Sequence, residues 1–169
     1  MSATFSEDRT RRYLLGREWD TLKLIGVESR GTLGFVMLNP SMAGEKDDDP
    51  TIRKCIGFAK RWNYSAIIVG NLIAVVVTDP YSLPPWRGLY HDNEFHLKIL
   101  LTCDEIIVAW GGVAKALRRS IALNEHILRF RELCGDRQLH CIGLTKGGDP
   151  LHPSRAHYTK SMQEWQWNS

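Results

Sequence analysis

The run Phe-Val-Met-Leu-Asn-Pro-Ser at residues 35–41 constrains the fold more than any other stretch of the sequence. Its first four residues are apolar, as in a strand that is buried on both faces of a parallel sheet. The Asn-Pro pair ends such a strand, because proline has no N–H for a sheet ladder and keeps the preceding residue extended. Asn39 is therefore expected at the carboxyl end of a strand, the edge at which open α/β sheets bind ligands. The alternative is that Asn39 only organises the turn.

Apolar segments of strand and helix character alternate along the rest of the chain. The clearest helix start is the Asp-Asp-Asp-Pro run at residues 47–50, where Asp49 suits the N-cap and Pro50 the first helical position. Further strands are expected at residues 11–19, 22–28, 65–71, 105–110 and 139–144, and further helices at residues 93–101, capped by Asp92, and 113–133, as one helix or two. This order predicts an α/β fold, a single three-layer domain with a mostly parallel central sheet flanked by helices.

The domain boundaries follow from the ends of this pattern. Residues 1–10 are polar and mixed in charge, so they are expected to form a disordered tail before a single domain at residues 11–169. The segment after Tyr158 contains Trp165 and Trp167 and is expected to lie back on that domain. A chain of 169 residues is long enough for one sizeable core and short for two.

Composition excludes several classes of protein. No apolar run approaches the roughly 18 residues of a membrane span, and residues 1–12 lack the apolar core of a secretory signal. A cytoplasmic protein without membrane partners is therefore expected. The four cysteines form no Cys-x-x-Cys pair, which argues against a zinc site, an iron–sulfur cluster or a disulfide framework and favours buried thiols. The net charge of +3 permits a nucleic-acid partner without requiring one.

Polar residues follow three of the expected strands. Asn39 and Asn71 each end one, and the loop after the last strand leads to His152-Pro153-Ser154. Because parallel strands end at the same edge of a sheet, these groups are expected to converge on one pocket. Two amides and an imidazole suit recognition of a planar heterocycle and stabilisation of a developing oxyanion. The set lacks the nucleophile with an adjacent base that acyl transfer needs.

Three motifs resemble an uncharacterised family, domain-of-unknown-function family sixteen-forty-three. They are Met-Leu-Asn-Pro-Ser at residues 37–41, Asp-Asp-Pro-Thr-Ile-Arg at residues 48–53 and Gly-Leu-Thr-Lys-Gly-Gly-Asp-Pro-Leu-His-Pro at residues 143–153. The resemblance extends from about Tyr13 to Pro153 and names no activity.

A more distant resemblance does imply an activity. Asn-Pro at residues 39–40, Val-Gly-Asn-Leu at 69–72, Ile-Val-Ala-Trp-Gly at 107–111 and His-Pro-Ser at 152–154 are similar, in this order, to motifs of the uracil-DNA glycosylase superfamily. The resemblance implies the fold of that superfamily. It also implies a monofunctional DNA glycosylase, which flips a base out of DNA and hydrolyses its N-glycosidic bond without metal or organic cofactor.

The same resemblance implies a role for each matching residue. Asn39 would position the hydrolytic water, and His152 would hydrogen-bond the pyrimidine O2 as negative charge develops there. Asn71 would read the edge of the base, with Pro40 and Ser41 beside it. The expected DNA contacts are Ser154, through a phosphate, and the basic residues Arg155 and Lys146.

The chain departs from the superfamily pattern at four points, one of which is the absence of the usual glycine before Asn39. Ser41 stands where the best-known members have a tyrosine that excludes a 5-methyl group, so a 5-substituted pyrimidine is expected to fit unless Trp62, Tyr81 or Trp86 fills the space. The usual leucine wedge is replaced by Arg-Ala-His at residues 155–157. Asn39 can hold a water but cannot deprotonate it.

The expected partner is DNA with a modified or deaminated base, in repair or in antiviral defence, and the expected assembly is a monomer. Two alternatives stay open. One is a non-catalytic module that binds a nucleobase or nucleic acid, and the other is an enzyme that acts on a free modified nucleotide. Salt dependence separates them, because binding to DNA weakens steeply with salt and binding to a mononucleotide does not.

Overall fold

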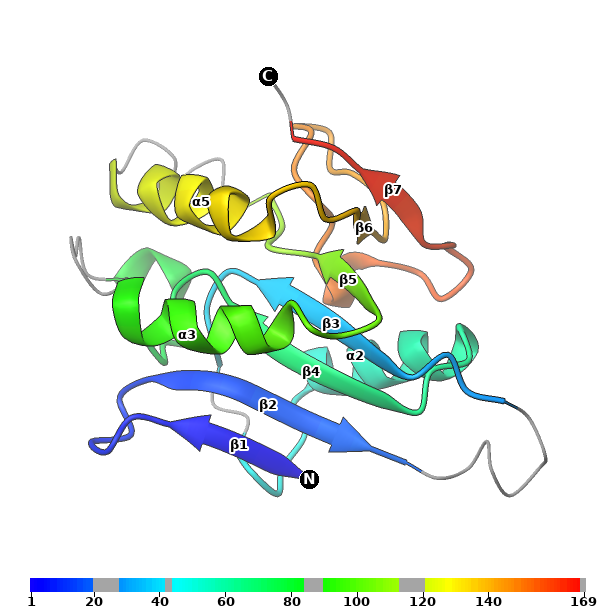
Figure 1. The fold of residues 1–169 in the computed structure, drawn as a ribbon, viewed down its shortest axis with the longest axis horizontal. Coiled ribbons are helices and arrows are strands. Elements are labelled where there is room, and N and C mark those ends of the chain that lie inside the picture. The colour runs from blue at the N-terminus through cyan, green and yellow to red at the C-terminus, as the bar shows by residue number, and fades with distance from the viewer. Residues whose placement is uncertain (20–27, 42–43, 84–89, 113–120, 168–169) are drawn as a thin grey trace.

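A computed structural model describes residues 1–19, 28–41, 44–83, 90–112 and 121–167. The described chain forms one seven-stranded sheet with the order β1-β2-β4-β3-β5-β6-β7 (Figure 1). The strands are β1 (Ser2–Phe5), β2 (Arg12–Glu18), β3 (Thr32–Met37), β4 (Ala66–Asn71), β5 (Glu105–Val108), β6 (Leu139–Cys141) and β7 (Gln163–Trp165). The described helices are α2 (Pro50–Arg61), α3 (Tyr90–Leu100) and α5 (Ile121–Cys134), with short 3₁₀ turns η1 (Pro80–Ser82) and η2 (Pro153–Arg155).

The sheet is mixed, so the prediction of a mostly parallel sheet is wrong. The four central strands β4, β3, β5 and β6 are parallel. The outer strands β1, β2 and β7 join them by antiparallel pairings. Six residues separate β1 from β2, which is too short for the crossover that a parallel pair needs, so these two strands can only be antiparallel.

The prediction of a disordered N-terminal tail is also wrong. Residues 2–5 form the edge strand β1, which pairs with β2 from Gly16 to Arg12. Hydrogen bonds from Ser6 and Thr10 to the Asp8 carboxylate close the turn between the two strands. The alternating exposure of β1 spans only four residues, too few to stand out in the sequence.

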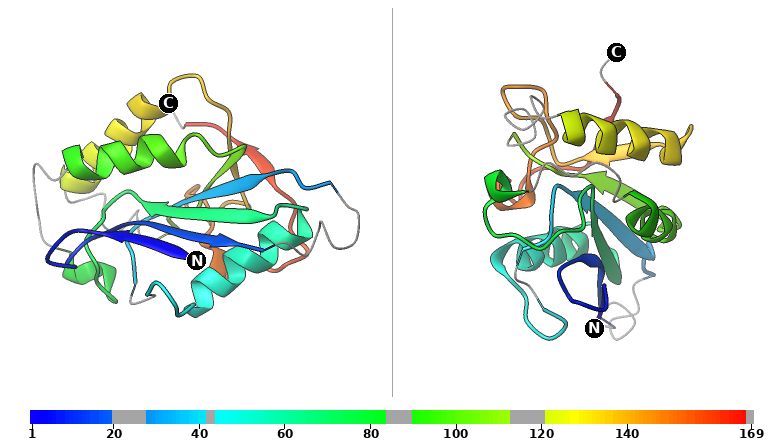
Figure 2. Two further views of the ribbon diagram at one scale, coloured as in Figure 1. Left: turned by 60° about the horizontal axis from the view of Figure 1, so that its bottom comes forward. Right: turned by 90° about the vertical axis from the view of Figure 1, so that its left-hand side faces the viewer.

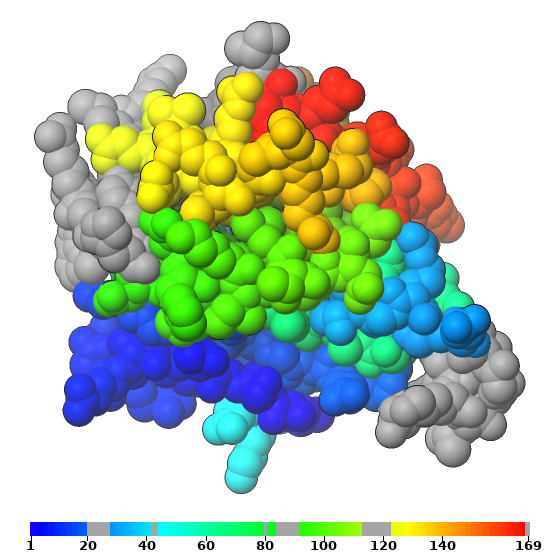
Figure 3. Space-filling view, in the orientation of Figure 1, coloured from blue at the N-terminus to red at the C-terminus, as the bar shows by residue number. Residues whose placement is uncertain are grey.

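Helices cover both faces of the sheet (Figures 1 and 2). On β3, Leu33, Phe35 and Met37 pack in the core cluster that contains the apolar face of α2. Val36 and Leu38 point the other way, into the cluster formed with α3 and α5. Figure 3 shows the second face, with the α3 and α5 side chains lying over the sheet. Because both faces of β3 are covered, every side chain from Leu33 to Leu38 is buried, as the apolar run predicted.

The predicted start of α2 is confirmed. Asp49 has an extended backbone and its Oδ1 accepts a hydrogen bond from the N–H of Ile52 at 2.8 Å. By contrast, α3 begins at Tyr90, so Asp92 lies within its first turn and does not cap it. The expected strand at residues 22–28 and the first turns of the helix expected at residues 113–133 lie outside the described residues. The C-terminal segment does lie on the domain, since β7 pairs with β6.

The chain leaves the neighbouring strands β3 and β5 in opposite directions. From β3 it passes through α2 to β4, and from β5 it continues to β6 on the other side of the sheet centre. Such a reversal leaves a crevice at the carboxyl ends of the two strands, where open α/β sheets bind ligands. Asn39 follows β3 and Trp110 follows β5, so both residues lie at this crevice.

The cysteines are buried thiols, as predicted: Cys55, Cys103, Cys134 and Cys141. Burial raises the pKa of Cys103 to about 11 and the pKa of Cys134 to about 12, so both are protonated at neutral pH.

Within the ranges given above, no helix has the length and apolar character needed to cross a membrane. Those ranges likewise contain no group of three His, Cys, Asp or Glu side chains placed to hold a metal ion.

The buried His126 on α5 makes stability depend on pH. Burial lowers the pKa of His126 from 6.5 to about 4, so the unfolded chain binds a proton more readily than the folded one between these values. We therefore expect the free energy of unfolding to fall by about 3 kcal/mol as the pH is lowered from 6.5 to 4. Urea titrations across this range measure it. His126→Gln should remove the part of the slope that this histidine contributes, and a slope unchanged in that variant would contradict the assignment.

Candidate functional site

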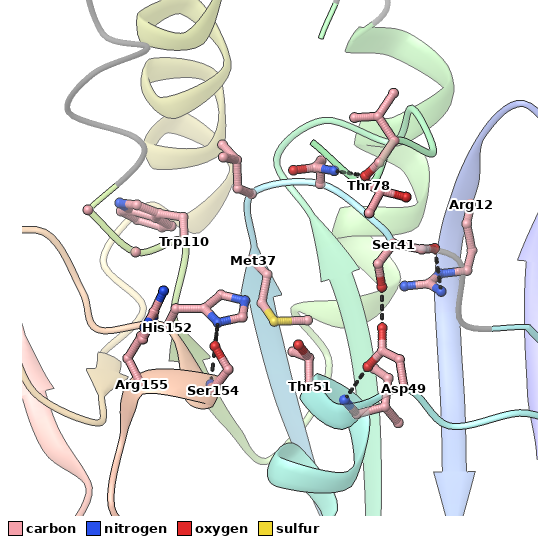
Figure 4. A pocket seen from close by; sticks show the side chains of 16 residues that line it. Arg12, Met37, Ser41, Asp49, Thr51, Thr78, Trp110, His152, Ser154 and Arg155 are labelled. Atoms are coloured by element: carbon pink, nitrogen blue, oxygen red, sulfur yellow. Dashed lines mark hydrogen bonds between the residues drawn. The ribbon is translucent and has the colours of Figure 1, made fainter. Parts of the chain in front are cut away.

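A pocket of about 560 Å³ opens at the crevice between the carboxyl ends of β3 and β5 (Figure 4). Its walls come from the start of β2, the turn after β3, the first turn of α2, residues 77–78, the turn after β5, and η2. Five of the eight residues predicted for the site line it: Asn39, Ser41, His152, Ser154 and Arg155. The sequence therefore predicted correctly that the Asn-Pro-Ser and His-Pro-Ser segments meet.

The other three predicted residues do not line this pocket. Lys146 is exposed on a loop. Pro40 is buried, and its carbonyl accepts a hydrogen bond from Asn39 Nδ2. Asn71 is 1% exposed, and neither atom of its side-chain amide has a hydrogen-bond partner among the described residues. It is paired in register with Met37, whose side chain does line the pocket, so Asn71 lies one strand away from the cavity.

Asn39 has a clear structural role. Its Nδ2 donates to the carbonyl oxygens of Val77 at 2.8 Å and Pro40 at 3.1 Å, which ties the turn after β3 to residues 77–78. The alternative interpretation as a turn organiser is thus correct in part. Both amide hydrogens are used, so Oδ1 is the atom with which Asn39 can serve a ligand or a water.

His152 is a neutral imidazole with its proton on Nε2. The N–H of Ser154 donates to His152 Nδ1 at 3.3 Å, so Nδ1 is an acceptor and the Ser154 hydroxyl, at 2.8 Å, donates to it as well. Burial lowers the pKa of His152, against a smaller opposing effect of Asp49. In Figure 4 the second ring nitrogen is turned toward Met37, into the pocket. The pocket therefore contains a neutral N–H donor at a fixed position.

The turn after β5 holds the His152 loop in place. The N–H of Gly111 donates to the Pro150 carbonyl at 2.8 Å, and Gly111 has a φ of +79°, which favours glycine. A Cβ at this position would lie 3.0 Å from the Cβ of His152. Glycine is required here both by the backbone and by the closeness of the histidine.

Gly111→Ala should lower the free energy of unfolding by about 1–2 kcal/mol and displace His152. Chemical denaturation measures the first effect, and the ¹⁵N and ¹H shifts of the His152 ring measure the second. Gly135→Ala is the matched control, because Gly135 also has a positive φ, of 52°, but no atom within 4 Å of an added Cβ. Equal perturbation of the His152 ring in the two variants would contradict the contact.

A polar wall, consisting of Arg12, Ser41 and Asp49, faces His152 across the pocket, with Met37 and Thr51 between them (Figure 4). The Ser41 hydroxyl donates a short hydrogen bond to Asp49 Oδ2. Arg12 is 1% exposed, and its Nη1 donates to the Ser41 carbonyl at 3.4 Å. Burial lowers the pKa of the Arg12 guanidinium, and the carboxylate of Asp49 opposes that effect. Sequence patterns assigned Asp49 to the helix cap alone and gave no sign of Arg12, which looks like any residue of an alternating strand.

Trp110 is the aromatic side chain of this pocket. It lines the cavity from the end of β5 and is held by an edge-on contact with Trp165, whose ring centroid is 5.3 Å away. The aromatic residues considered from the sequence lie elsewhere: Trp62 packs on Phe58, and Tyr81 is 64% exposed. Trp86 lies outside the described residues.

The pair Ser154–His152 is a hydroxyl next to an imidazole, which the sequence analysis did not find. Acyl-transfer enzymes use such a pair, but there the base is oriented by a third group. Here Nδ1 also accepts the N–H of Ser154, two residues away, in the manner of a local cap. Among the described residues no carboxylate hydrogen-bonds to His152, so the pair is best explained as a device that fixes the ring.

A comparison with models of known protein families gave a match that covers most of the chain. A family model described as "Protein of unknown function (DUF1643)" matches residues 12–154 of the 169. The chain belongs to the DUF1643 family. This is the family that the three sequence motifs resemble, so that prediction is confirmed. The DUF1643 match contains every pocket residue named above except Arg155. Comparisons with curated proteins and with solved structures gave no match.

Proposed function

We propose that this DUF1643 protein is a monofunctional DNA glycosylase with a fold like that of the uracil-DNA glycosylases, which hydrolyses the N-glycosidic bond of a flipped pyrimidine. The neutral His152 is the observation that carries the proposal. A glycosylase must stabilise negative charge on the departing base, and a fixed N–H donor at the pyrimidine O2 provides this. An imidazole with its proton on Nε2 and its Nδ1 already occupied is suited to that task.

The other pocket residues fit the same reaction. The oxygen of a water, held by Asn39 Oδ1, forms a bond to the sugar C1′ while the C1′–N1 bond breaks and its electron pair leaves with the base. Because an amide cannot take up the proton of the water, that proton passes to solvent, and the base anion is protonated from solvent. Trp110 borders the pocket from the end of β5, and Ser154 and Arg155 lie at the pocket where the DNA backbone would pass.

The test uses oligonucleotides that carry one uracil, thymine, 5-hydroxymethyluracil or glucosylated pyrimidine in single or double strands. Abasic sites, revealed by alkaline cleavage, are expected with at least one of them. Selective binding of one base without any abasic site would favour the non-catalytic binding module. Strong binding of a free nucleotide, insensitive to salt, would favour the nucleotide enzyme.

Arg155 should contribute to DNA binding more than basic residues elsewhere. Arg155→Ala should weaken binding and reduce the slope of log Kd against log salt by about 1. Arg129→Ala should leave that slope unchanged, because Arg129 lies on α5 and already pairs with Glu94 at 3.0 Å and Glu132 at 2.6 Å. Fluorescence anisotropy at several salt concentrations measures both. Equal slopes in the two variants would mean diffuse attraction without a footprint at the pocket.

A further inference from the structure

We propose that the polar wall of the pocket selects a pyrimidine that carries a hydroxyl-bearing substituent on C5. The inference rests on the proposed pyrimidine site and adds the class of substrate. It concerns three side chains, Arg12, Ser41 and Asp49, of which the sequence pointed only to Ser41.

The geometry of the pyrimidine ring gives the first step. C2 and C5 are opposite atoms of the six-membered ring, so a base whose O2 accepts from His152 directs C5 to the far side of the pocket. Figure 4 shows Ser41 and Asp49 on that side, across Met37 and Thr51 from His152. A substituent on C5 would therefore meet the polar wall, and not the Trp110 side.

The chemistry of the wall gives the second step. The Asp49 carboxylate accepts one hydrogen bond on each oxygen, from Ser41 Oγ and from the N–H of Ile52, and each oxygen can accept another. Arg12 brings a guanidinium, which only donates, to the same wall. A hydroxyl group both donates and accepts, so it can serve the carboxylate and the guanidinium together.

An unsubstituted or methylated C5 lacks this capacity. A C5–H or a methyl group would remove water from the Asp49 carboxylate and return no hydrogen bond, which costs binding free energy. The wall therefore discriminates against uracil and thymine because they take water from the Asp49 carboxylate and offer no donor in its place. A cavity of about 560 Å³ also has room for more than a bare ring, since sites of 300–1,000 Å³ enclose drug-sized ligands.

The experiment measures binding and cleavage with the same single-stranded oligonucleotides. They differ only in one base, which is uracil, thymine, 5-hydroxymethyluracil or glucosylated 5-hydroxymethylcytosine. Anisotropy gives the Kd and alkaline cleavage gives the abasic sites. We expect at least one hydroxyl-bearing base to be preferred over thymine by about tenfold or more, as one hydrogen bond to a charged group provides.

Asp49→Ser tests the wall itself. Serine caps a helix as well as aspartate does, so the variant keeps the start of α2 and removes the carboxylate. The preference for the hydroxyl-bearing base should fall to about twofold or less. Asp47→Ser is the matched control, because Asp47 belongs to the same acidic run, is exposed and does not line the pocket. It should keep the full preference.

Each outcome decides between the proposals. Equal binding and cleavage of all the bases would contradict the proposal that the polar wall selects the substrate. A preference that survives in a folded Asp49→Ser protein would contradict it as well. If Asp49→Ser does not fold, Ser41→Tyr is the second test. Its ring fills the same side of the pocket, so it must selectively abolish binding and cleavage of the substituted base. A preference in binding without abasic sites would support selection by the polar wall and contradict the proposed glycosylase activity. Absence of both base-dependent binding and abasic sites would reject the two together.

Discussion

His152→Ala should reduce abasic-site formation by about 100- to 1,000-fold, the usual cost of removing one oxyanion donor. The imidazole contributes a neutral N–H. Burial lowers its pKa and so keeps the ring neutral, and the contacts with Ser154 hold it in one tautomer. His152→Gln keeps a neutral amide donor of similar reach and should recover part of the loss. Single-turnover rates with excess enzyme measure the effect on chemistry apart from binding.

The control for this prediction is His157→Ala. His157 lies in the same segment, is exposed and does not line the pocket, so its removal should leave the rate within about twofold, as for most surface substitutions. Thermal melting accompanies each variant. If His152→Ala melts many degrees lower, the histidine is structural, and if it cleaves normally, the proposed donor role is wrong.

Asn39→Asp should destabilise the protein and should not create a faster enzyme. Its amide nitrogen donates to the carbonyls of Val77 and Pro40, and a carboxylate at the same place would oppose two carbonyl oxygens with a negative charge. The loss of two hydrogen bonds and the repulsion should together cost about 2–4 kcal/mol of unfolding free energy. Urea denaturation at pH 7 measures it.

Asn39→Ala provides the comparison. It loses the same two hydrogen bonds without adding a charge, so it should be less destabilised than Asn39→Asp. Both variants should cleave more slowly than the parent, because Asn39→Ala removes Oδ1 and Asn39→Asp moves the turn that carries it. An aspartate variant that is as stable as the parent and cleaves faster would show that Asn39 holds its water through a different geometry and could act as a base.

The sequence was most informative where a local rule has a single physical solution. Only a strand buried on both faces needs an apolar residue at every position, and the run ending at Leu38 is such a strand. The Asp-Pro pair at residues 49–50 marks a helix start because an apolar stripe at helical spacing follows it, whereas the same pair at residues 149–150 lies in a loop. Because β3, β5 and β6 are parallel, their carboxyl ends share one edge, which is why Asn39 after β3 and His152 after β6 could be brought together from the sequence.

Several predictions from sequence patterns failed because the residues that decide the outcome are remote in sequence. β1 is a strand because β2 offers it a ladder, not because of its own four residues. Asn71 ends β4 as expected, yet side-chain alternation and the neighbouring Met37 leave it one strand away from the cavity. Trp110, which lines the pocket and is held by Trp165 from the far end of the chain, was not among the aromatic residues considered from the sequence.

The sequence by itself determined the α/β class, the family and the edge of the sheet at which two polar motifs meet. Only the tertiary structure decided which charges face them. Arg12 comes from an antiparallel strand and Asp49 from a helix cap, and neither position carries a local signal for a pocket. Their approach to Ser41 depends on how the sheet and α2 pack, and packing is a sum of many distant contacts that no short stretch of sequence contains.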